Sequence, residues 1–241
     1  MKIISNKVIS MKKILLSAVM LLTVTSGLIA DDNWDWPNYK RYANANAELL
    51  RNAPEDPRRV VFFGNSITDA WPRVRPDFFE NNDFVGRGIS GQTTYQFVLR
   101  FSEDVIKLKP ALVVINAATN DVAENTCPYD EQRSFRNIVS MVEMAQANGI
   151  KVILTSVLPA AKFGWNPKIT DSSEKIASLN ALIKDFADKS GIPYVDYYSA
   201  LVFGEDKALN PAYSGDGVHP NSEGYAIMEN IVLPVVRQYV P

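Results

Sequence analysis

Cysteine and histidine are almost absent from this chain of 241 residues, which contains one of each, Cys127 and His219. A single cysteine cannot form an intramolecular disulfide, so the folded chain must rely on its core for stability. The single histidine is also the only imidazole, the side chain best suited to accept a proton near neutral pH. Any histidine-dependent chemistry must therefore use His219.

An excess of positive charge is also missing, since 25 Lys and Arg residues stand against 27 Asp and Glu. Residues 1–30 hold four of the lysines and none of the acidic residues, so the chain without them has a net charge of −6. Neither nucleic acid nor an anionic membrane surface attracts an acidic protein, and we predict neither as a partner. Oligomeric state is left open by the sequence.

Long hydrophobic runs are missing except near the N-terminus, where four lysines precede an apolar run at residues 14–22 and small residues follow to Ala30. This order is typical of a secretory signal peptide, and the run is short for a membrane span. We predict a signal peptide at residues 1–30, with an uncleaved anchor as the alternative and the start at Met1 or Met11. The mature chain should be exported, periplasmic or extracellular, without stable membrane insertion.

Residues 31–57 form a polar N-terminal extension that contains Trp and Tyr. After residue 57, apolar runs alternate with amphipathic segments. Helical stripes such as Ile138, Val142 and Ala145 separate the runs. The pattern predicts one α/β domain at residues 58–241, a three-layer α/β/α sandwich around a central, mainly parallel five-stranded sheet. The expected strands are residues 60–63, 84–86, 111–116, 151–156 and 193–196.

Polar residues follow the predicted strands, and ligands bind at the carboxyl ends of strands in open parallel sheets. The first strand delivers Ser66, the second a glycine-rich loop with Gly91, the third Asn120, and a later loop Asp216 and His219. Taken singly, each has a structural alternative: a helix cap, a turn, a capping pair, or an exposed histidine. Their convergence on one edge favours a catalytic site.

The spacing of Asp216 and His219 lets the carboxylate reach Nδ1 across a single turn, which would direct Nε2 toward a hydroxyl group. With the blocks "FFGNSIT", "GRGISGQTT", "ATND" and "DGVHPN" in this order, the chain resembles the SGNH (GDSL-type) serine hydrolases, which have a flavodoxin-like fold. The likeness covers residues from about 58 to the C-terminus. Three positions depart from the family pattern: Asn65, Gln92 and Ala118.

The resemblance implies an ester hydrolase in which Ser66 is the nucleophile, His219 the base and Asp216 its partner. It also implies an oxyanion hole formed by the N–H groups of Ser66 and Gly91 and the Asn120 amide. We attribute the glycine at position 91 to close backbone approach, since it lacks Cβ. Such a reaction needs neither a metal nor an organic cofactor.

The substrate is predicted less directly. A small-molecule or glycan ester with a short acyl group, such as acetyl, is our first interpretation, because no long apolar lid insertion is visible. Trp71, Arg87 and Trp165 are possible substrate-binding residues, with core packing or surface pairing as the alternatives. Two other functions stay open: a lysophospholipase or thioesterase for longer acyl chains, and a non-catalytic carbohydrate-binding protein on the same fold.

Overall fold

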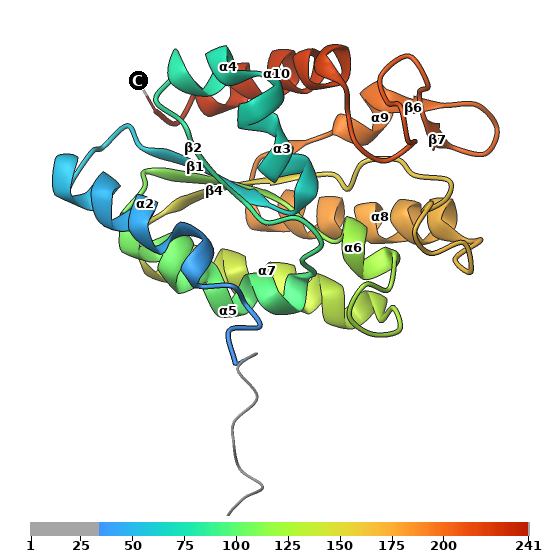
Figure 1. The fold of residues 1–241 in the computed structure, drawn as a ribbon, viewed down its shortest axis with the longest axis horizontal. Helices are drawn as coiled ribbons and strands as arrows, with labels where there is room; N and C mark the ends of the chain where they lie inside the picture. Colours follow the sequence, from blue (N-terminus) through green and yellow to red (C-terminus); the bar gives the residue numbers. More distant parts are fainter. Residues whose placement is uncertain (1–33, 241) are drawn as a thin grey trace, which may run out of the picture. The chain divides into compact units, whose positions relative to one another are not determined.

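A five-stranded sheet with the strand order β2-β1-β3-β4-β5 forms the centre of the fold (Figure 1). The computed structural model describes residues 34–240, so the predicted signal peptide lies outside the described residues. Every pairing in this sheet is parallel, which confirms the predicted α/β fold. The strands are β1 (Val60–Gly64), β2 (Val85–Gly88), β3 (Leu112–Asn116), β4 (Lys151–Thr155) and β5 (Tyr194–Val195).

Helices cover both faces of the sheet and complete the three layers (Figure 1). One face carries α3 (Ser66–Val74), α4 (Pro76–Glu80), α9 (Tyr197–Leu201) and α10 (Ser222–Val236). The other carries α5 (Thr94–Asp104), α7 (Glu131–Ala147) and α8 (Ser172–Ser190), with α2 (Lys40–Asn52) beside α5. None of the helices described for residues 34–240 is long and apolar enough to cross a membrane.

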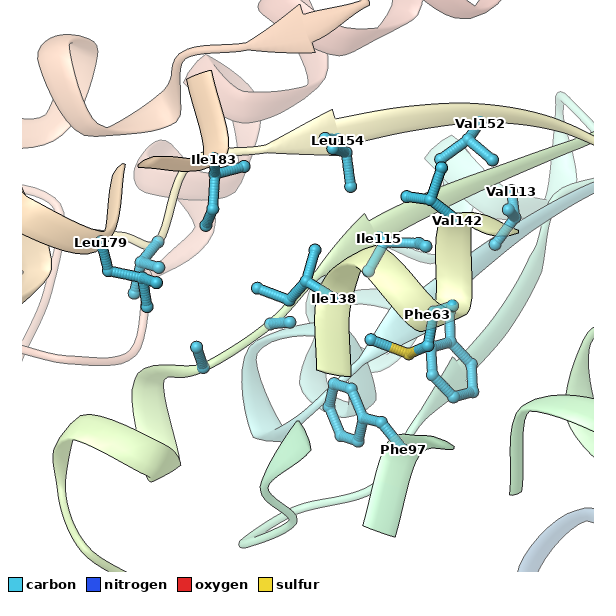
Figure 2. Packing of buried hydrophobic residues seen from close by; sticks show 14 of the residues in the cluster. Phe63, Phe97, Val113, Ile115, Ile138, Val142, Val152, Leu154, Leu179 and Ile183 are labelled. Carbon is cyan, nitrogen blue, oxygen red and sulfur yellow. The ribbon is translucent and has the colours of Figure 1, made fainter. Parts of the chain in front are cut away.

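Alternate residues of each strand point to opposite layers, as the pleat of a β-strand requires. Phe63, Ile115 and Leu154 pack against α5, α7 and α8, as Figure 2 shows. Phe62, Val114 and Ile153 belong to the second cluster, on the side of α3 and α10. Since both faces are covered, the central residues of β1, β3 and β4 are apolar without alternation, which explains why these strands stand out in the sequence.

Connections near the sheet's last strand differ most from the prediction. Strand β5 is two residues long rather than four, because Asp196 instead caps α9 and its Oδ1 accepts from Ser199 N at 3.0 Å. A small antiparallel hairpin then follows, formed by β6 (Val202–Phe203) and β7 (Ala208–Leu209). Short helices also occur elsewhere in the described chain, among them η1 (Ile106–Leu108) and α6 (Thr119–Val122).

The N-terminal helix α2 is joined to the sheet by side-chain hydrogen bonds. Asn46 Nδ2 donates to Asp104 Oδ1 at 2.9 Å, and Asn46 Oδ1 accepts from Arg87 Nε at 2.7 Å. The Tyr42 hydroxyl also donates to the carbonyl oxygen of Gly88 at the end of β2. Within the described residues, the chain from Pro37 onward forms one compact unit.

Candidate active site

Ser66 is the first residue of α3 and stands two residues after Gly64, the last residue of β1. The residue that caps this helix is Asn65, whose Oδ1 accepts from the N–H of Ile67 at 3.0 Å. An N-cap side chain of this type normally contributes about 1 kcal/mol. Asn65 therefore takes the capping role that Ser66 could have filled, and the Ser66 hydroxyl is available for another bond.

Gly88 allows α3 to lie close to the sheet. A Cβ atom at this position would lie 2.1 Å from the backbone nitrogen of Asp69 and 2.5 Å from the carbonyl carbon of Thr68. Because backbone atoms cannot move aside as a flexible side chain can, any larger residue would push the helix outward. Gly88 thus fixes the height of Ser66 above the sheet edge.

Ser66, His219 and Asp216 form a continuous chain of contacts. Ser66 Oγ lies 2.8 Å from His219 Nε2, and His219 Nδ1 lies 2.7 Å from Asp216 Oδ2. With the imidazole proton on Nδ1, the ring donates to Asp216 and accepts from the Ser66 hydroxyl. The structure thus brings together three side chains that 150 residues of sequence separate, in an arrangement suited to activate a serine.

Asp216 is held as a carboxylate by several donors. Burial by itself would raise its pKa, but hydrogen bonds from the backbone N–H and imidazole of His219 and from the N–H of Val218 outweigh that effect and lower the pKa to about 2. The two backbone bonds reach Asp216 Oδ1 at 2.8 and 2.9 Å. The group therefore stays ionised well below neutral pH and can stabilise a protonated imidazole.

The loop that carries Asp216 and His219 is closed by its own hydrogen bonds. Ser214 pairs with Pro220 across the loop, and Ser214 Oγ accepts from the N–H of Gly217 at 2.9 Å. Asn221 then caps α10 through an acceptor bond from Gly224 N at 3.0 Å. These contacts fix the loop conformation and therefore the orientation of the His219 side chain.

Gly91 lies beside Ser66 in the pocket, at the end of the glycine-rich loop. Its φ angle is +80°, a conformation that side-chain-bearing residues rarely adopt, whereas a Cβ there would meet no atom within 4 Å. The backbone conformation is thus a reason for glycine at this position, and the close approach of a substrate to its backbone stays a prediction. Within residues 34–240 neither the Ser66 nor the Gly91 N–H takes part in a backbone–backbone hydrogen bond.

Asn120 and Asp121 follow β3 and divide two roles between them. Asn120 lines the pocket and uses one amide hydrogen to donate to the carbonyl oxygen of Gln92 at 2.9 Å, which leaves the second for the pocket. Asp121 is turned away, and its carboxylate accepts from Thr94 N and Ser134 Oγ at 3.0 Å each. Burial raises the pKa of Asp121, and these donors oppose that shift.

Gln92 fastens the glycine-rich loop from behind. Its side-chain oxygen accepts from Arg100 Nε at 2.6 Å, and its amide nitrogen donates to the carbonyl oxygen of Pro37 at 2.7 Å. A carboxylate at this position, as is frequent in the family the chain resembles, could not make the second bond. The departure at residue 92 is thus matched by a contact with the N-terminal segment.

A pocket of about 350 Å³ opens above Ser66. Two larger hollows, of about 490 Å³ each, contain none of the predicted catalytic residues. Trp165 lies in the active-site pocket, as the sequence suggested, and two lining residues, Ser90 and Asn125, were not anticipated. Ser90 precedes Gly91 in the motif "GRGISGQTT", whereas no motif in the sequence indicates that Asn125 lines the pocket. The lining residues are Ser66, Ser90, Gly91, Asn120, Asn125, Trp165 and His219.

Trp71 and Arg87 do not lie in this pocket, which corrects their interpretation as substrate-binding residues. Trp71 is 2% exposed, because its ring stacks against Phe78 and its indole N–H donates to Glu229. Arg87 is 7% exposed and is bound to Asn46 beneath α2. Both side chains point into the protein because strand and helix packing, not proximity to a motif, decides their direction.

Ala118 stands in the left-handed region, with φ of +78°, immediately before α6. The positive φ explains why glycine is usual here in the family the chain resembles, since alanine in this conformation costs about 1–2 kcal/mol. Its methyl group is buried in the core beneath the site. The methyl therefore contributes hydrophobic burial that offsets the strain.

We expect Ala118→Gly to change the free energy of unfolding by no more than about 1 kcal/mol. Relief of the strained φ is offset by a lost methyl, about 0.8 kcal/mol, and by a more flexible unfolded chain. The matched control is the buried neighbour Ala117, whose φ is not positive; Ala117→Gly should destabilise by about 1–2 kcal/mol. Urea unfolding measures both, and equal losses in the two variants would contradict the strain at Ala118.

Candidate metal ligands are not gathered in the part of the chain that the structure describes. Within residues 34–240 no three His, Cys, Asp or Glu side chains are grouped so that they could share a metal ion. A reaction without metal or cofactor stays a prediction.

Comparison with known proteins identifies the class. Residues 62–227 match the model of the GDSL-like Lipase/Acylhydrolase family, to which the chain therefore belongs. A GDSL-like lipase from Bacteroides thetaiotaomicron is 59% identical, with 84% of this chain and 98% of that one covered and a TM-score of 0.81. The family and the fold expected from the sequence are thus confirmed.

Two curated relatives are esterases by name. The multidomain esterase of Ruminococcus flavefaciens is 31% identical over 138 residues, which are 56% of this chain and 16% of that protein. The acetylxylan esterase of Xylanibacter ruminicola is 24% identical over 220 residues, 76% of this chain and 44% of that protein. The chain thus spans less than half the length of these two curated relatives.

Proposed function

We propose that the protein is an exported serine esterase that hydrolyses esters of short acyl groups, such as acetyl groups on carbohydrates. The observation that carries this proposal is the contact chain Ser66–His219–Asp216 next to Gly91 and Asn120. Export is supported by the signal-peptide pattern of residues 1–30. The binding partner of the proposed enzyme is its substrate, a small-molecule or glycan ester.

The reaction proceeds through an acyl-enzyme. Ser66 Oγ attacks the ester carbonyl while its proton moves to His219 Nε2, and Asp216 stabilises the imidazolium. The negative charge on the former carbonyl oxygen is met by the N–H groups of Ser66 and Gly91 and the free amide hydrogen of Asn120. Collapse of the intermediate expels the alcohol, which takes the proton from His219. Water, deprotonated by His219, then attacks the acyl carbonyl; the bond to Ser66 Oγ breaks, the acid leaves, and Ser66 Oγ takes the proton back from His219.

The pocket lining supports a short acyl group. Trp165 is the only large apolar side chain among its residues, so a long acyl chain would find little apolar surface to cover it. The name of the relative from Xylanibacter, an acetylxylan esterase, points in the same direction. A lysophospholipase or thioesterase for long chains would need an apolar wall that this lining lacks.

Hydrolysis of p-nitrophenyl esters from acetate to decanoate tests the proposal. We expect kcat/KM to be highest for acetate and to fall at least about tenfold along the series, because a methylene group that a pocket cannot accept costs about 10–200-fold. A rise with chain length would favour the lipid or thioester function instead. An enzyme inert toward every ester would contradict the catalytic proposal and favour a carbohydrate-binding protein.

A further inference from the structure

Trp165 stands at the mouth of the pocket with 48% of its surface exposed. The residue lies between β4 and α8, and three neighbours hold its ring. Its indole N–H donates to Asn125 Oδ1 at 2.8 Å, and its centroid lies 5.2 Å from that of Phe163 and 6.3 Å from that of His219. An exposed tryptophan fixed on several sides is a surface prepared for contact.

Asn125 links this tryptophan to the catalytic loops. The Asn125 side-chain Nδ2 donates to the carbonyl oxygen of Gly91 at 3.3 Å. The Asn125 backbone N–H donates to the carbonyl oxygen of Asn120 at 3.0 Å. Asn125 therefore contacts the two segments that would hold the oxyanion, those of Gly91 and Asn120, and it also accepts the hydrogen bond from the indole N–H of Trp165. Through Asn125, the position of the Trp165 ring is set relative to Ser66.

The indole N–H already donates to Asn125, so the exposed aromatic ring is the part of Trp165 that a ligand can contact. The negative face of an aromatic ring attracts the positively polarised C–H groups on one side of a sugar ring. Asn125 and the Ser90 hydroxyl, which donates to Asp69 Oδ2 at 2.7 Å and can still accept, lie in the same pocket for sugar hydroxyls. The described lining includes no Lys or Arg, so an uncharged ligand fits better than a phosphate or a uronic acid.

The position of Trp165 next to His219 indicates which part of the ester Trp165 would bind. His219 must protonate the leaving alcohol, so the alcohol portion of the substrate lies on the histidine side of the scissile bond. Trp165 lies on that side, with its ring tilted 38° to the imidazole. The group that meets the indole is therefore the leaving alcohol.

We propose that Trp165 forms a subsite for the alcohol portion of the substrate, an uncharged pyranose ring that stacks on the indole face, and that Asn125 is the positioning residue that holds the indole. This inference rests on the proposed esterase function and names the substrate class of the same site. It makes Trp165 the residue that distinguishes a glycan acetate from a simple alkyl acetate.

The test compares acetylated xylobiose with ethyl acetate as substrates. Both esters form the same acetyl-enzyme, so the ratio of their kcat/KM values reports only on the alcohol portion. Trp165→Ala is expected to lower this ratio about tenfold, the effect of losing an aromatic stacking surface. Trp165→Phe, which keeps a flat ring, should restore part of it, and Asn125→Ala should lower it by raising KM for acetylated xylobiose.

Phe203→Ala serves as the matched control, since Phe203 is 57% exposed in the β6–β7 hairpin outside the pocket, and it should leave the ratio unchanged. An unchanged ratio in Trp165→Ala, with both esters still hydrolysed, would overturn the subsite and leave the esterase function intact. A wild-type protein that hydrolyses neither ester would instead overturn the esterase function on which the subsite rests.

Discussion

Ser66→Ala should lower kcat/KM for acetate esters by about 10⁴- to 10⁶-fold, because members of a Ser-His-Asp unit fail together when one is lost. The hydroxyl stands 2.8 Å from the single imidazole of the chain, and within residues 34–240 no other serine oxygen has that contact. Stopped assays with p-nitrophenyl acetate would measure the loss. Residual activity would come from the donors of the pocket alone.

Two controls separate chemistry from folding in this experiment. Ser102→Ala removes an exposed hydroxyl of α5 that does not line the pocket, and this variant should keep full activity. The thermal transition of Ser66→Ala should match that of the wild type, since its side chain does not cap α3. If Ser66→Ala kept more than about 1% of the activity, another nucleophile would be at work, and the proposed mechanism would be wrong.

Arg100→Met should destabilise the protein by about 3–5 kcal/mol, the cost of removing one partner from a buried ion pair. The guanidinium is fully buried and lies 4.1 Å from the centroid of the Phe63 ring. Burial lowers the pKa of Arg100 to about 10, and Asp104 opposes that shift. Without Arg100, the buried carboxylate of Asp104 would lose its ion-pair partner and keep the hydrogen bond from Asn46.

Arg100 also holds the segments that carry Ser66 and Gly91. It donates to the carbonyl oxygens of Gly64 at 2.8 Å and Arg87 at 3.0 Å, to Gln92 Oε1 at 2.6 Å and to Asp104 Oδ2 at 3.0 Å. Gly64 is two residues before Ser66, and Gln92 directly follows Gly91. A variant that still folds should therefore also lose activity.

Thermal unfolding measures the loss, which we expect to lower Tm by roughly 6–20 °C for a domain of this size. Arg136→Met, an exposed arginine of α7, is the matched control and should stay within about 0.5 kcal/mol of the wild type. Adding Asp104→Asn to Arg100→Met should recover part of the stability, because it removes the unpaired charge. A loss below about 1 kcal/mol in Arg100→Met would contradict this account of the network.

The strands and the order of the motifs could be read from the sequence because both depend on local pattern. Residues 111–115 are apolar at every position, since helices cover both sheet faces, and β3 lies within one residue of the expected strand at 111–116. Ser66, Gly91 and Asn120 each follow a strand, so the parallel topology alone brings them to one edge. The short β5 was less predictable, because Asp196 serves the next helix.

Side-chain direction and backbone conformation were decided only by the tertiary structure. Trp71 and Trp165 are alike in the sequence, but one stacks in the core and the other lies open in the pocket, because packing between distant elements sets exposure. Asn125 has no motif, and the positive φ of Ala118 has no local cause that the sequence displays. Local patterns therefore determined which residues could meet, and long-range packing determined which of them face the pocket.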